Sequence, residues 1–249
     1  MNKTPAARNP GLPLVVLACL FLTMLASSCN PRLSNGLRKK DLDKDVAIIT
    51  DMGTIVVRLS DSTPLHRDNF LKLAKSGFYD SNLFHRVIKR YIIQGGDPDS
   101  RKGHPGKPLS QGGSGGPGYT IPAEFRPSLY HKRGALGAAR QNDDVNPLKA
   151  SSGSQFYIVV GKTYTSAALD SLQNGRLKNV WKIPADLRTL YETKGGAPHL
   201  DQQYTIFGEV ISGMDVVDSI VAVPTHGPPL DRPVNDVHLL KMKLVRRRG

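Results

Sequence analysis

After the first forty-five residues, short segments in which apolar and polar residues alternate recur along this chain. In the run 54–59, Ile55, Val57 and Leu59 fall on one face of an extended segment. This run and the apolar run 46–50 are joined by a turn at 51–53, which predicts a hairpin. Similar runs predict further strands at 83–88, 91–94, 119–121, 130–140, 154–160, 205–211 and 237–245.

Two segments have the periodicity of a helix instead. The first begins at Thr63, a good N-cap residue, and Pro64, and its apolar stripe contains Phe70, Leu73 and Ala74. The second is 213–221. Strands do not alternate regularly with helices, so we expect an all-β domain, closed or sandwiched, with helical caps.

The strands 83–88 and 91–94 are joined by a basic turn, and the second ends at Gly95-Gly96. The period of two predicts that Phe84, Arg86 and Ile88 share a face. A guanidinium is costly to desolvate unless it has partners. Arg86 is therefore a candidate functional residue, with Gln94 as a candidate partner or as a second polar group on the same surface.

The run from Phe84-His85-Arg86-Val87-Ile88 to Gln94-Gly95-Gly96-Asp97 resembles a signature of the cyclophilin family. Two further blocks, 153–158 and 200–210, also resemble this family, and the resemblance covers 46–245. It implies a closed eight-stranded antiparallel barrel capped by two helices. The segment 164–198 interrupts this pattern where the family often has a much shorter connection, so we expect a partly helical insertion, either beside the groove or on the surface with no role in catalysis. The resemblance also implies a peptidyl-prolyl isomerase (EC 5.2.1.8) that needs no cofactor and no metal.

The same resemblance implies the site residues. Arg86 is the expected donor to the prolyl nitrogen, and Gln94 is expected to hold the preceding carbonyl or to orient Arg86. The implied substrate-binding residues are Tyr91, Ile92, Ala139, Arg140, Gln155, Tyr157, His199, Leu200 and Tyr204. Five of these depart from the family pattern: Tyr91 and Tyr157 replace Phe, Arg140 replaces Asn, Tyr204 replaces His, and His199 replaces Trp.

Other functions fit the sequence less well. The segment 112–116 matches G-x-S-x-G, but no strand precedes it and no helix follows it, as a hydrolase nucleophile requires. The segment 161–163 resembles the end of a P-loop whose first glycine is replaced by Phe156. The histidines lack metal-ligand spacing, so His66, His104, His131 and His226 are expected to be exposed or structural. A non-catalytic module that binds proline-containing segments remains an alternative.

The N-terminus predicts export. A positive start and an apolar run at 12–26 form a signal peptide, 1–28, followed by Cys29 in a lipobox-like context. We expect Cys29 to be lipidated and residues 29–45 to tether the domain, 46–249, to a bacterial envelope membrane. Asn30 favours the periplasmic side of the outer membrane. Cys19 is the only other cysteine and leaves with the signal peptide, so no disulfide is expected.

The excess of basic residues bears on whether the protein binds lipid or nucleic acid. The chain has 34 Lys and Arg against 21 Asp and Glu. Removing Lys3 and Arg8 with the signal peptide leaves a net charge of +11. The charges are scattered apart from 246–248, so we expect a solvated surface near anionic lipid and no nucleic-acid partner. The expected partners are proline-containing exported polypeptides, bound by a monomer.

Overall fold

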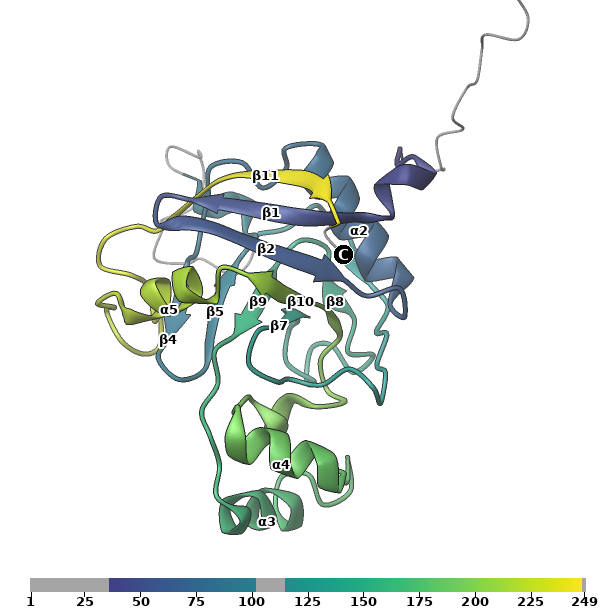
Figure 1. Cartoon of the computed structure of the whole chain (residues 1–249), viewed down its shortest axis with the longest axis vertical. Helices are drawn as coiled ribbons and strands as arrows, with labels where there is room; N and C mark the ends of the chain where they lie inside the picture. Colours follow the sequence, from purple (N-terminus) through teal and green to yellow (C-terminus); the bar gives the residue numbers. More distant parts are fainter. Residues whose placement is uncertain (1–35, 102–114, 248–249) are drawn as a thin grey trace, which may run out of the picture.

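A computed structural model describes residues 36–101 and 115–247. Residues 1–35, including the predicted signal peptide and Cys29, and His104 lie outside the described residues. Most of the described strands form one strongly curled antiparallel sheet (Figure 1). In sheet order they are β3 (Asn82–Leu83), β11 (His238–Arg246), β1 (Lys44–Thr50), β2 (Gly53–Leu59), β10 (Ile206–Ser212), β7 (Ala135–Ala138), β9 (Phe156–Val159), β5 (Ile92–Gly95) and β4 (Arg86–Ile88). A separate pair contains β6 (Thr120–Ile121) and β8 (Ser151–Ser152).

The two outermost strands of this sheet are consecutive in the chain. Only Phe84 and His85 separate β3 from β4, so the segment 82–88 links both ends of the sheet. The Phe84 amide, between these strands, donates to the Val237 carbonyl at 3.0 Å. The Val87 amide, in β4, donates to the Asp231 carbonyl at 2.8 Å. Counted as one interrupted strand, 82–88 gives the eight strands expected. The predicted all-β, antiparallel barrel with helical caps is confirmed.

The main core lies inside the curled sheet. Ile48, Ile55 and Ile158 are fully buried there and belong to three different strands. Two helices close the core, as predicted: α2 (Pro64–Lys75) and α5 (Met214–Ala222). Phe70 of α2 packs with its ring edge against Phe156 of β9, with ring centroids 5.4 Å apart. The helix therefore holds the inner face of the wall whose outer face carries the site described below.

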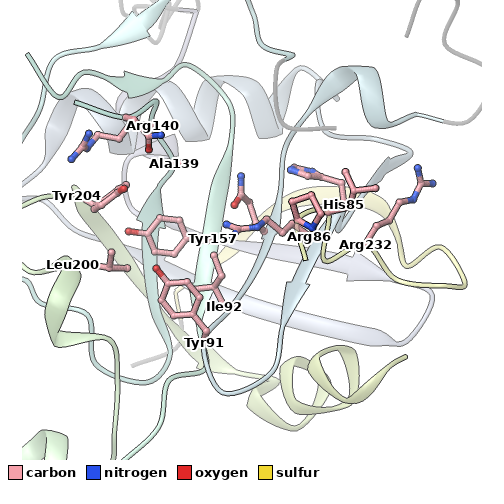
Figure 2. A pocket seen from close by; sticks show the side chains of 14 residues that line it. His85, Arg86, Tyr91, Ile92, Ala139, Arg140, Tyr157, Leu200, Tyr204 and Arg232 are labelled. Carbon is pink, nitrogen blue, oxygen red and sulfur yellow. The ribbon is translucent and has the colours of Figure 1, made fainter. Parts of the chain in front are cut away.

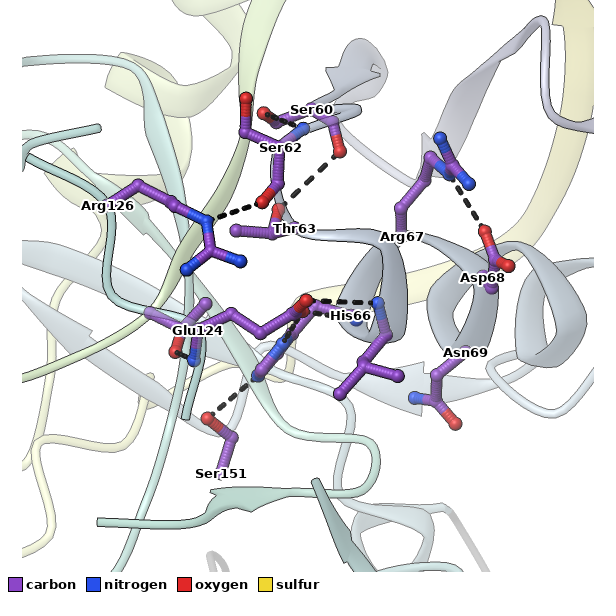
Figure 3. A network of polar contacts seen from close by, with 12 residues as sticks. Ser60, Ser62, Thr63, His66, Arg67, Asp68, Asn69, Glu124, Arg126 and Ser151 are labelled. Carbon is purple, nitrogen blue, oxygen red and sulfur yellow. Dashed lines mark hydrogen bonds and ion pairs between the residues drawn. The ribbon is translucent and has the colours of Figure 1, made fainter. Parts of the chain in front are cut away.

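A buried polar network holds the start of α2 (Figure 3). The backbone amides of Leu65 and His66 donate to the Glu124 carboxylate, which caps the helix. Thr63 occupies the N-cap position, but its hydroxyl donates to the Ser60 carbonyl instead of capping the helix. The expected local cap is thus replaced by a carboxylate from a distant loop, which the local sequence pattern does not reveal.

The same network has the order of a Ser–His–Glu triad. The His66 ring nitrogens lie 2.7 Å from the Glu124 carboxylate and 2.9 Å from the Ser151 hydroxyl. Ser151 is only 1% exposed, so its hydroxyl is closed to a substrate. Burial lowers the pKa of His66. These residues stabilise the fold, as predicted for His66.

The insertion 164–198 is partly helical, as predicted. It contains α3 (Ser166–Asn174) and α4 (Ala185–Thr193), which project from one end of the barrel (Figure 1). A small core of its own includes Leu169, Leu187 and Tyr191. The described chain also has three short 3-10 helices: η2 (Lys39–Asp41), η3 (Pro98–Ser100) and η5 (Pro198–Leu200).

The start of the folded domain differs from the expected boundary at residue 46. Leu37 is fully buried and belongs to the main core, and β1 begins at Lys44. Asp41 of η2 accepts a hydrogen bond from Lys75 of α2 at 2.6 Å. The two apolar residues of this stretch, Leu37 and Leu42, are separated by polar residues, so the stretch has no periodicity that would identify it as folded.

Within 36–101 and 115–247, no helix has both the length and the apolar character needed to cross a bilayer. The same residues contain no group of three or more His, Cys, Asp or Glu side chains placed to hold a metal ion.

Candidate active site

A pocket of about 350 Å³ opens on the outer face of the barrel wall. Nine of the residues expected at the site line it: Arg86, Tyr91, Ile92, Gln94, Ala139, Arg140, Tyr157, Leu200 and Tyr204. In Figure 2, Arg86 lies on one side of the pocket, Leu200 and Tyr204 lie on the other, and Tyr91, Ile92 and Tyr157 lie between them.

The strand register explains how these residues meet. Arg86 of β4 lies opposite Gln94 of β5, and Gln94 lies opposite Tyr157 of β9. Directly opposed residues of antiparallel strands project from the same face. The three polar side chains therefore form a row across the outer face. Their neighbours Ile93 and Ile158 point inward to the main core.

One detail of the expected alternation is wrong. Phe84 is fully buried in the main core together with Val87, so it does not share a face with Arg86. The strand is interrupted at Phe84 and His85, and this break changes which side chains face outward. As a result, consecutive residues His85 and Arg86 both line the pocket, although strict alternation would separate them.

Arg86 pairs with Asp231, and Gln94 is a second polar group on the same surface. The Arg86 Nε lies 3.5 Å from a carboxylate oxygen of Asp231, while 37% of the Arg86 side chain stays exposed. Gln94 instead donates to the Gln155 side chain at 3.1 Å, and Gln155 donates to the Gly115 carbonyl at 2.8 Å. Gln155 thus lies behind Gln94 and is not among the lining residues.

The Tyr157 ring forms the buried floor of the pocket. Its hydroxyl lies 2.8 Å from Nε2 of His131, whose Nδ1 lies 2.9 Å from the Asp201 carboxylate. Tyr191 of α4 donates to the other Asp201 oxygen at 2.6 Å. Burial raises the pKa of Tyr157 well above its ordinary value, so the hydroxyl stays neutral. The hydroxyl that distinguishes Tyr157 from the usual Phe is therefore satisfied below the pocket.

The small residues of β7 make this floor possible. A Cβ atom at Gly137 would collide with the Tyr157 ring. The close neighbour of Gly137 is thus a side chain of the same molecule, which a glycine alone accommodates.

Arg140 closes one end of the pocket. Its guanidinium carbon lies 4.4 Å from the centre of the Tyr204 ring, and its Nε donates to the Gln203 carbonyl at 2.8 Å. A further ion pair to Asp143 spans 2.5 Å. The departure from Asn to Arg thus brings a cation whose planar group stacks on the second departure, Tyr204.

His199 supports the pocket from behind. It is not among the lining residues, but its ring stacks on Tyr91 with centroids 5.4 Å apart. Its Nε2 lies 3.4 Å from the Tyr91 hydroxyl. Burial lowers the pKa of His199 to about 4, so the ring is neutral near pH 7.

Five lining residues were missed: His85, Asn142, Pro229, Leu230 and Arg232. Three of them, and Asp231, belong to the loop between α5 and β11. No motif marks this loop, and the structure brings it to the pocket by pairing the Asp231 carbonyl with the Val87 amide. Only His85 carried a signal, because it lies within the quoted motif.

The buried His85 makes stability depend on pH. Burial lowers the pKa of His85 to about 4, against about 6.5 in an unfolded chain. The unfolded state therefore binds more protons between these values, and stability falls as the pH drops from 6.5 towards 4. Between pH 7 and pH 5, the free energy of unfolding should fall by about 1–2 kcal/mol less in His85→Gln than in the wild type.

Urea unfolding at both pH values measures this difference. His226 is exposed, so His226→Gln serves as the control and should keep the wild-type pH dependence. Equal losses of stability in wild type and His85→Gln would contradict the prediction.

Comparisons with known proteins agree on one family. The model of the family described as "Cyclophilin type peptidyl-prolyl cis-trans isomerase/CLD" matches residues 45–244. A Staphylococcus aureus protein named "Putative peptidyl-prolyl cis-trans isomerase" is 32% identical over 208 residues, which cover 83% of this chain and 93% of that protein.

Two further similarities extend this result. A Streptococcus pyogenes protein named "Putative bifunctional phosphatase/peptidyl-prolyl cis-trans isomerase" is 35% identical over 195 residues, 77% of this chain but only 37% of that protein. A crystal structure of a Cryptosporidium parvum cyclophilin type peptidyl-prolyl cis-trans isomerase superposes with a TM-score of 0.58 and 25% identity, covering 82% of this chain and 99% of that one. The same parasite protein was also crystallised in the presence of the dipeptide Ala-Pro.

Proposed function

The chain belongs to the cyclophilin-type peptidyl-prolyl cis-trans isomerases, and we propose that Arg86 drives its reaction by stabilising the twisted X-Pro bond without covalent chemistry. The observation that carries this proposal is the row of Arg86, Gln94 and Tyr157 across β4, β5 and β9. It places a permanent cation beside an aromatic slot, with Arg86 extending from one side of the pocket (Figure 2).

The chemistry follows from the peptide bond itself. Rotation about an X-Pro bond removes the nitrogen lone pair from conjugation, which gives a barrier of about 18–20 kcal/mol. In the twisted state the nitrogen becomes a better hydrogen-bond acceptor. A donor aimed at it therefore favours the transition state over both planar isomers. Arg86 suits this role because its donors are fixed in a plane and its charge does not titrate.

The remaining residues hold the substrate on either side of this bond. The proline ring occupies the slot formed by Tyr91, Ile92, Tyr157 and Leu200, which belong to or adjoin a buried apolar cluster. The peptide backbone lies along Ala139 and Arg140. Gln94, oriented by Gln155, holds the carbonyl that precedes the proline. His199 and Tyr204 support the slot through their contacts with Tyr91 and Tyr157.

An isomerisation assay with a short proline peptide separates this mechanism from a non-catalytic proline-binding module. Wild-type protein should raise the rate well above the uncatalysed background, and Arg86→Ala should abolish most of the increase. Background rates in both proteins, with peptide binding retained, would favour the binding module.

We further propose that the protein acts as a monomer in a bacterial envelope, on exported polypeptides, while anchored through lipidated Cys29. The signal-like segment 1–28 and the lipobox-like context of Cys29 support this proposal. Cys29 lies eight positions before Leu37, the first buried residue among those described. An extended chain of this length spans about 30 Å at most, which keeps the domain close to the membrane.

Mass spectrometry of the protein from bacterial membranes tests the anchor. We expect a mature chain that begins at an acylated Cys29, because the signal peptide is cleaved before it. Cys29→Ala should leave the membrane fraction, while Lys39→Ala serves as a control outside the lipobox. An unmodified Cys29 or an uncleaved chain would contradict the anchor.

A further inference from the structure

A second hollow adjoins the substrate pocket on the side of the insertion. It is an open hollow of about 660 Å³ between the β4–β5 turn and the segment that carries α3. Six of its lining residues matter here: Lys89, Arg90, Tyr91, Lys162, Arg176 and His199. We call this hollow the basic basin.

The basic basin concentrates positive charge without neutralising it. Its lining residues include four Lys and Arg side chains and no Asp or Glu. In the described part of the chain, Lys89, Arg90 and Arg176 have no ion pair or side-chain hydrogen bond, and the Lys162 ammonium lies over the Tyr164 ring at 5.2 Å. A hollow lined by one sign of charge attracts the opposite sign and raises its local concentration.

Two cations outside the basin are paired. Arg188 of α4 lies 2.7 Å from Asp170 of α3, and Lys132 lies 2.6 Å from Glu209. The insertion thus contains a carboxylate, Asp170, but this carboxylate pairs with Arg188 and not with Arg176. His199 is neutral near pH 7, so the charge of the basin belongs to its lysines and arginines.

The basin is continuous with the substrate pocket through Tyr91. This residue lines both hollows, and His199 stacks on it. A polypeptide whose proline lies against Tyr91 extends beyond the slot in two directions, and the basin is one of the surfaces it meets. Arg176, Tyr164 and Leu172 of the insertion form the far side of this surface.

We propose that the basic basin is an extended subsite that binds acidic side chains flanking the substrate proline, so that the insertion makes the protein selective for acidic segments. This inference rests on the proposed placement of the proline in the slot beside Tyr91. Charge complementarity and continuity with the slot favour an acidic polypeptide as the occupant.

The test compares three peptides of equal length with one Ala-Pro core. One carries three Gln residues, one carries three Glu residues before the core, and one carries three Glu residues after it. At low salt, one acidic peptide should have a kcat/KM about 3- to 10-fold above that of the Gln peptide, since several weak ion pairs act together. The advantage should disappear in about 0.5 M salt, where charges are screened.

Matched double variants locate the effect. Lys162→Gln/Arg176→Gln should reduce the ratio between acidic and neutral peptides to nearly one. Lys178→Gln/Lys182→Gln removes the same charge from a different hollow of the insertion and should keep the wild-type ratio. Equal kcat/KM values for all three peptides, or an advantage that survives Lys162→Gln/Arg176→Gln, would overturn the proposal.

Fluorescence anisotropy with labelled peptides keeps this test independent of catalysis. If the isomerisation rate were at background, the mechanism proposed for Arg86 would fail, while the ratio of Kd values would still decide the subsite. Vesicles containing phosphatidylglycerol provide the remaining comparison. Binding to vesicles that depends on Lys162 and Arg176, with no preference among the peptides, would assign the basin to lipid and overturn the proposal.

Discussion

Replacing Arg86 by alanine is expected to lower kcat/KM for X-Pro isomerisation by about 100- to 1000-fold. Removal of one preorganised donor to a developing charge or lone pair typically costs this much. The loss should appear mainly in kcat, because the proposed hydrogen bond strengthens only as the nitrogen leaves conjugation. The measurement is steady-state isomerisation of a proline peptide at several substrate concentrations.

Two control variants and a stability measurement distinguish a loss of catalysis from a loss of folding. Arg86 is 37% exposed and its Asp231 contact spans 3.5 Å, so its loss should cost about 1 kcal/mol of stability or less. Arg188→Ala removes an arginine from a remote ion pair and should retain wild-type activity. Arg86→Lys keeps the charge but loses the planar fork, so it should recover only part of the rate. Full activity in Arg86→Ala would refute the proposed mechanism.

Much of the barrel was predictable because its strands obey one local rule. In β2 and β9, side chains alternate between the core and the opposite face, so the apolar pattern alone identifies the inner face. Phe156 and Ile158 point into the main core while Tyr157 faces the pocket, as expected. The helix α2 was predictable for a similar reason, since its stripe of Phe70, Leu73 and Ala74 is buried.

Most of the site residues were predictable from the resemblance to family motifs and not from the hydrophobic pattern of the sequence. The motif residues lie on three hydrogen-bonded strands, so their positions follow from the register once the family is recognised. The loop that carries Asp231 and Leu230 could not be placed, because long-range contacts bring it to the pocket. The break at Phe84 and His85 was equally hidden, since an interrupted strand still has a strand-like composition.

Asp201→Ala is expected to produce the largest loss of stability. Asp201 is fully buried, and its carboxylate accepts hydrogen bonds from the His131 backbone amide and from Tyr191 while contacting the His131 ring. Alanine leaves these buried groups without their partner, which typically costs about 3–5 kcal/mol. The melting temperature should fall by about 10 °C for a domain of this size. Urea denaturation and thermal melting both measure the effect.

The position of Asp201 also links stability to substrate binding. Through His131 it holds the Tyr157 hydroxyl, and through Tyr191 it ties α4 of the insertion to the pocket floor. Asp201→Ala, assayed well below its melting temperature, should therefore raise KM for the proline peptide while Arg86 keeps most of kcat. Asp170→Ala removes an exposed carboxylate from the insertion and should change stability by less than about 1 kcal/mol. If Asp201→Ala unfolded at the same urea concentration as Asp170→Ala, this network would not support the pocket floor.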